Sequence, residues 1–157
     1  MNVSQYLCVP LHNLSDIMLL KPSPIQTTYS SEFYNIEIDR ENNLIMTVWQ
    51  RPVNKDELIA GGTKLYEALR DTGITRVVAN AERLTTPDAP SKEWLSTTFY
   101  ELLSQTSLQK LARVLPESLF AKLALEAVAT RAEAQNITKF FFKNFSSQKE
   151  ALIWIQE

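Results

Sequence analysis

Apolar and polar residues follow two different periods along this chain, and each period predicts a type of element. Strict alternation over residues 33–39 predicts a half-buried strand. Residues 44–49 return as a second strand after Glu41-Asn42-Asn43, which predicts a hairpin. Three later segments have apolar residues at consecutive positions, which is typical of strands buried on both faces: 74–81, 108–115 and 138–143.

Segments with apolar residues at helical intervals lie between these predicted strands and after the last one. Asn54 and Glu57 form a capping pair before Leu58, and Gly73 stands where a helix C-terminus favours a left-handed residue. Further helices are predicted around Trp94 to Leu103, around Leu119 to Val128, and after Ser147 through Trp154. The element order β-β-α-β-α-β-α-β-α predicts an α/β fold with a mixed, mostly parallel five-stranded sheet and helices on both faces.

The first 30 residues lack a sustained period of either kind. Residues 1–30 are therefore interpreted as an N-terminal arm, partly ordered or packed on the domain, and residues 31–157 as one α/β domain. A length of 157 residues fits a single core.

Composition argues against several function classes. A net charge of −2 gives no basic field for nucleic acid, and no segment is long and apolar enough to span a membrane. The only histidine, His12, and the only cysteine, Cys8, lie in the arm, so a zinc site or a nucleophilic triad is not expected in the body of the fold. Neither a cofactor nor a metal is expected, the protein is not expected to be an enzyme, and one cysteine suits the cytoplasm.

Two features inside the predicted elements need a physical reason. The pair Gly61-Gly62 costs helix stability, which indicates close approach by a neighbouring helix, a second subunit or a ligand, with packing favoured. Arg113 falls in a predicted strand on the same side as Leu111. It is expected to pair with a carboxylate such as Glu82, or to cover apolar surface while its head reaches water.

The element order, together with Phe140-Phe141-Phe142 and the ending Glu150-Ala151-Leu152-Ile153-Trp154, resembles the STAS-like, or SpoIIAA-like, family of small bacterial proteins. The resemblance covers about residues 33–157. It implies a regulatory domain that acts by binding another protein. In anti-sigma factor antagonists of this family, a serine after the third strand is phosphorylated. Residues 80–88 of this chain contain neither a serine nor a glycine, which puts that switch in doubt.

Two candidate sites follow. Ligands of open α/β sheets bind beyond the carboxyl ends of the strands. We expect an interaction rim there, with Thr85 or Thr86 as the residue open to modification or as part of a simple turn: Asn80, Glu82, Arg83, Thr85, Thr86 and Asp88. The fold also looks similar to CRAL-TRIO lipid-carrying domains, so an apolar ligand is the alternative, lined by Trp94, Phe99, Leu102, Phe120 and Leu123. The same apolar stripes also suit a plain core or a homodimer face.

Overall fold

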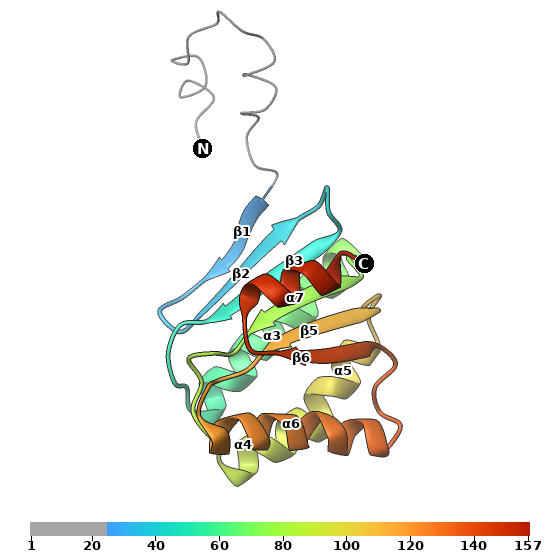
Figure 1. The fold of residues 1–157 in the computed structure, drawn as a ribbon. Coiled ribbons are helices and arrows are strands. Elements are labelled where there is room, and N and C mark those ends of the chain that lie inside the picture. Colours follow the sequence, from blue (N-terminus) through green and yellow to red (C-terminus); the bar gives the residue numbers. More distant parts are fainter. Residues whose placement is uncertain (1–24) are drawn as a thin grey trace, which may run out of the picture.

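A computed structural model describes residues 25–157 and contains one six-stranded sheet. The strands lie side by side in chain order: β1 Ile25–Ser30, β2 Tyr34–Asp39, β3 Leu44–Trp49, β4 Arg76–Asn80, β5 Lys110–Val114 and β6 Phe141–Phe145. The first three strands are antiparallel, and β3 to β6 are parallel (Figure 1). The predicted mixed, mostly parallel sheet is therefore confirmed.

Helices connect the parallel strands and follow the last one. Their bounds are α3 Lys55–Thr72, α4 Ala89–Glu93, η1 Trp94–Phe99, α5 Tyr100–Ser104, α6 Leu119–Ala134 and α7 Gln148–Ile155. The predicted second helix is thus an uninterrupted run of α4, a π-helical turn η1, and α5. In the described part of the chain, no helix is long and apolar enough to cross a membrane.

Both faces of the sheet are covered by helices, as predicted. Because the parallel strands follow one another in order, right-handed crossovers place their connecting helices on one face. The large core cluster lies on this face and includes Val77 and Leu111. Their neighbours Val78 and Ala112 point to the opposite face, where α7 covers a smaller cluster (Figure 1).

The helix termini bear out their sequence signals. Asn54 Oδ1 accepts the Glu57 N–H at 2.8 Å, and the Glu57 carboxylate accepts the Asn54 N–H at 3.2 Å. Gly73 ends α3 with φ of 70°, the left-handed conformation that glycine adopts without strain. Ser147 caps α7 by accepting the Glu150 N–H at 3.2 Å.

The predicted count of five strands was one too low. β1 comes from residues 25–30, inside the predicted arm, and pairs antiparallel with β2. Its sequence IQTTYS is largely polar and mostly exposed, so backbone pairing rather than a buried side-chain pattern places it in the sheet. The rest of the predicted arm, residues 1–24, lies outside the described residues.

The last strand differs from its prediction in exposure. Residues 138–143 were expected to be buried on both faces, but β6 is an edge strand with a single neighbour, β5. Phe141 is 79% exposed as a result, and Phe145 is half-buried against Trp154. An apolar run predicts a strand without saying where in the sheet the strand lies, and this placement explains the difference.

Candidate functional site

The six predicted rim residues lie at the carboxyl edge of the parallel sheet, at the end of β4 and in the loop that follows it. Asn80 is half-buried and fixed by its neighbours. Its amide donates to Gln148 Oε1 at 3.1 Å and to Glu82 Oε1 at 3.3 Å, and its Oδ1 accepts the Glu82 N–H at 3.0 Å. These bonds hold the start of the loop against the beginning of α7.

The remaining rim residues are exposed. Arg83 donates to Gln50 Oε1 at 3.0 Å. Asp88 caps α4 by accepting the Ser91 N–H at 2.8 Å, and hydrogen bonds to Ser91 lower the pKa of the Asp88 carboxyl. Thr85 and Thr86 line a cavity of about 140 Å³ at this edge. The rim is therefore accessible to solvent, and within it Asp88 stabilises the N-terminus of α4.

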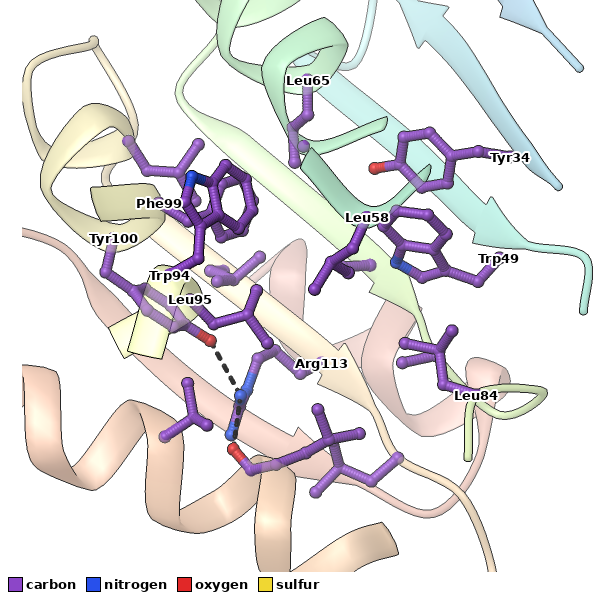
Figure 2. Close-up of a pocket in the computed structure, with 18 residues that line it drawn as sticks. Tyr34, Trp49, Leu58, Leu65, Leu84, Trp94, Leu95, Phe99, Tyr100 and Arg113 are labelled. Atoms are coloured by element: carbon purple, nitrogen blue, oxygen red, sulfur yellow. Dashed lines mark hydrogen bonds between the residues drawn. The ribbon is translucent and has the colours of Figure 1, made fainter. Parts of the chain in front are cut away.

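A second cavity, of about 70 Å³, lies deeper, between the sheet and its large helical layer (Figure 2). Two of the five predicted apolar-lining residues, Trp94 and Phe99, line it. The other three do not. Leu102 is half-buried on α5, and Phe120 and Leu123 are 78% and 52% exposed on α6. The volume is well below the ~300 Å³ at which typical small-molecule sites begin.

Aromatic rings and the glycine pair shape this cavity. Trp94 stacks on Phe99 with ring centroids 5.2 Å apart. A Cβ added to Gly62 would lie 2.7 Å from Trp94 Cη2, and one added to Gly61 would lie 2.6 Å from Trp49 Cη2. Packing therefore explains both glycines, which confirms the favoured interpretation of the pair.

The π-helical turn η1 was not predicted. The Tyr100 N–H donates to Leu95 O, five residues back, as a π-helical turn requires. Two hydroxyls bond to carbonyls of the preceding turns, Ser96 Oγ to Lys92 O at 2.9 Å and Thr97 Oγ1 to Glu93 O at 2.7 Å. Adjacent Ser and Thr in a helical pattern are the sequence signal for such an irregularity. Trp94, Leu95 and Phe99 of this turn all line the cavity.

Arg113 is the cavity residue whose surroundings the sequence did not predict. Its side chain enters the cavity from β5 and is 6% exposed. It reaches neither Glu82 nor water, so both sequence-based expectations for it were wrong. Instead its Nη1 donates to the Tyr100 hydroxyl at 2.8 Å and to Leu125 O at 2.9 Å, and its Nε donates to Asn144 Oδ1 at 2.9 Å. Figure 2 shows the guanidinium and the Tyr100 hydroxyl pointing toward one another.

Two further observations define the electrostatics of the cavity. Arg113 Nη2 is buried and has no hydrogen-bond partner in residues 25–157. Burial raises the pKa of the cavity-lining Tyr34 phenol far above its usual value, and the Thr47 side chain opposes the rise only partly. Arg113 is therefore a positive charge in surroundings of neutral and apolar groups. Among the described residues, no cluster of three or more His, Cys, Asp or Glu side chains is placed to hold a metal ion.

These observations define a mixed α/β protein with a polar rim at the carboxyl edge of its sheet and a small, charged cavity beneath it. Two solved structures are similar. The anti-sigma factor antagonist SpoIIAA in its unphosphorylated form has 12% identity and a TM-score of 0.49, covering 84% of this chain and 96% of that chain.

An uncharacterised protein of the DUF3478 family with a SpoIIAA-like fold, from Shewanella loihica PV-4, has 17% identity and a TM-score of 0.46, covering 83% of this chain and 91% of that chain. No protein-family model matches the sequence, and no curated protein does. Both structural matches have the fold that the sequence resemblance named.

Proposed function

We propose that this protein is a non-catalytic regulatory domain that works by binding another protein. The observation that carries the proposal is an exposed apolar surface on α6, which we term the α6 apolar face: Leu119, Phe120 and Leu123. These side chains are 63%, 78% and 52% exposed. They occupy the first turn and the start of the second, so they form one continuous surface. Large apolar side chains gathered at one place on a surface are typical of protein-binding sites.

The position of this face supports the same function. Four residues separate the end of β5 from the start of α6, and the rim loop begins directly after the neighbouring strand β4. The α6 apolar face and the rim therefore share the carboxyl edge of the sheet. The rim supplies polar and charged side chains such as Glu82 and Arg83 at the same edge, and apolar and polar side chains together have the composition of a protein–protein interface.

The surface is held on rigid elements. Arg131 on α6 and Glu93 on α4 pair at 2.6 Å, and this contact lowers the pKa of Glu93 and raises that of Arg131. Asp88 caps α4 next to the rim. A preorganised surface loses less conformational entropy when a partner binds. Thr85 and Thr86 are exposed in this rim, so phosphorylation of either hydroxyl would add charge at the edge of the sheet where α6 begins.

The proposed lack of catalysis rests on the residue inventory and on the tasks of the rim carboxylates. The sequence places its only histidine and only cysteine at positions 12 and 8. Asp88 is a helix cap, and Glu82 bonds to Asn80. The rim thus uses these carboxylates to fix the loop, which fits a binding surface better than acid–base chemistry.

The test compares two substitutions of exposed apolar residues by aspartate. Phe120→Asp changes the α6 apolar face, and Ile153→Asp, on α7 across the sheet, is the control because Ile153 is 57% exposed. Both variants are expected to fold, since an acidic residue in the first turn of a helix is favourable and Ile153 faces solvent. Each tagged protein is purified from the source cells, and its own association state is measured by sedimentation velocity.

We expect wild type and Ile153→Asp to retain the same partner, whether a different protein or a second copy, and Phe120→Asp to lose it. Equal partner recovery and equal sedimentation for all three proteins would contradict the proposal. Phosphopeptide mapping of the wild-type protein, in the same preparation, tests Thr85 and Thr86.

A further inference from the structure

The cavity contains a charge that no carboxylate of the described residues neutralises. Arg113 is 6% exposed, and its hydrogen-bond partners are a phenol, a backbone carbonyl and a side-chain amide, all of them neutral. No carboxylate of residues 25–157 lies within ion-pair distance of it. A guanidinium does not lose its proton in proteins, so this group cannot escape the cost of burial by becoming neutral, as a lysine does.

The unused part of the guanidinium has a defined position. Tyr100 and Leu125 hold Nη1, Asn144 holds Nε, and the ring of Phe142 lies 5.4 Å from the guanidinium carbon. The group is therefore fixed by contacts from η1–α5, α6 and β6, and Nη2 alone is left without an acceptor in the described structure. A buried donor without an acceptor is costly to stability, and a fixed one is ready to bind.

We propose that this cavity binds a small carboxylate with an apolar body, whose oxygens accept hydrogen bonds from Nη2 of Arg113. Planar carboxylates match the guanidinium, and the charge-assisted bond is strong where water is excluded. The walls that surround the rest of the ligand are apolar, including Trp94, Leu95 and Phe99. A volume of about 70 Å³ selects a short branched or unbranched acid and excludes a long acyl chain.

The rim provides the route of entry. The cavity of about 140 Å³ beside Thr85 and Thr86 shares four walls with the deeper cavity: Leu58, Leu84, Leu95 and Leu125. A small movement of these side chains joins the two spaces. The route begins at the polar loop and ends at the guanidinium, so it takes an amphipathic anion more readily than a neutral hydrocarbon. This inference does not rest on the protein-binding proposal, and either can fail alone.

The test uses the full chain and a pair of nearly isosteric probes, isovalerate and its neutral amide, isovaleramide. Calorimetric titration measures affinity, and the indole N–H signal of Trp94 and the Nε–H signal of Arg113 in the NMR spectrum report the place of binding. A charge-assisted hydrogen bond is worth about 1.5–3 kcal/mol, so the acid is expected to bind roughly 10- to 100-fold more tightly than the amide. Laurate and inorganic phosphate are expected not to shift either signal.

Two arginine variants distinguish binding at Arg113 from nonspecific attraction of the anion to the protein's other positive charges. Arg113→Met keeps the unbranched aliphatic part of the side chain without the guanidinium and is expected to reduce the affinity for isovalerate at least about 10-fold. Arg40→Met, exposed in the turn between β2 and β3 and away from the rim, is the control and is expected to leave the affinity unchanged. Equal affinity for acid and amide in the wild type, phosphate binding at the same signals, or absence of saturable acid binding would each overturn the proposal. The comparison of acid with amide decides the question even where Arg113→Met fails to fold.

Discussion

The two faces of the sheet are packed in different ways, although the same strands supply both. β5 presents Ala112 and Val114 to α7, and it presents Leu111 and Arg113 to the larger helical layer. On the α7 face, the contacts are closed, with five side chains completely buried: Val78, Ala112, Val114, Ala151 and Ile155. On the other face, a cavity of about 70 Å³, a π-helical turn and a buried guanidinium without a carboxylate partner among residues 25–157 lie within one cluster.

Both faces contain completely buried side chains, and within the described part of the chain only the cavity face combines them with a cavity and a buried guanidinium. Complete burial of small and branched side chains stabilises a fold and leaves no space for a ligand. A cavity and an uncompensated charge do the opposite, since each lowers stability unless something else occupies the space. The cavity and α6 lie on the same side of the sheet, and the rim lies at the edge where the two faces meet, so both proposals involve the cavity face. Substitutions on the two faces test this comparison.

The largest effect is expected on the α7 face. Ile155→Ala removes a fully buried side chain from a closed cluster, so we expect the free energy of unfolding to fall by about 2–5 kcal/mol. Ile153→Ala, two residues away and 57% exposed, is the control and should change stability by less than about 0.5 kcal/mol. Urea denaturation measures both. A loss below about 1 kcal/mol for Ile155→Ala would mean that α7 docks loosely, and the contrast between the faces would fail.

A smaller effect is expected where α3 meets the cavity. Gly62→Ala gains about 1 kcal/mol of helix propensity, but its Cβ would lie 2.7 Å from Trp94 Cη2 and 3.0 Å from Phe99 Cε1. Overpacking costs about 1–3 kcal/mol, so a net loss of about 1 kcal/mol is expected in thermal and urea unfolding. The exposed Ala60→Gly measures the propensity contribution alone.

An unchanged or higher stability of Gly62→Ala would show that the stacked rings of Trp94 and Phe99 yield into the cavity. The Trp94 indole signal in the NMR spectrum distinguishes the two cases, because a ring that moves changes its surroundings. Such a result would mean that side chains on the cavity face rearrange more easily than their packing in the structure indicates.

Much of the fold could be predicted because its signals are local. The hairpin of β2 and β3, the capping box of Asn54 and Glu57, and the left-handed Gly73 each depend on a few neighbouring residues. Consecutive apolar positions in β4 correctly indicated cover on both faces, since Val77 and Val78 enter different clusters. Right-handed crossovers then determine on which face of the sheet the connecting helices lie once the strand order is known.

What could not be predicted depends on distant parts of the chain. β1 is mostly exposed and lies in the sheet through its pairing with β2, and Phe141 is exposed because β6 has no outer neighbour. Arg113 has an unremarkable place in its strand, and its buried state follows from Tyr100, Leu125 and Asn144, which come from three other elements. Of the candidate site, the rim could be located from strand ends, whereas the charged cavity could not.

The smallest effect on stability is expected from substitutions at the N-termini of α6 and α7, the two helices that begin beside the rim on opposite faces of the sheet. Ser147 caps α7 with a hydrogen bond from the Glu150 N–H, whereas Ser118 stands at the N-terminus of α6 without a side-chain cap bond. Ser147→Ala is expected to lower the free energy of unfolding by about 1 kcal/mol, and Ser118→Ala by no more than a few tenths. Equal losses would show that the α6 terminus is as firmly held as that of α7. In that case the start of α6, with its exposed Leu119 and Phe120, would be an ordinary part of the stable framework. A negligible loss for Ser118→Ala would instead show that no side-chain cap contributes to the first turn of α6, in contrast to α7.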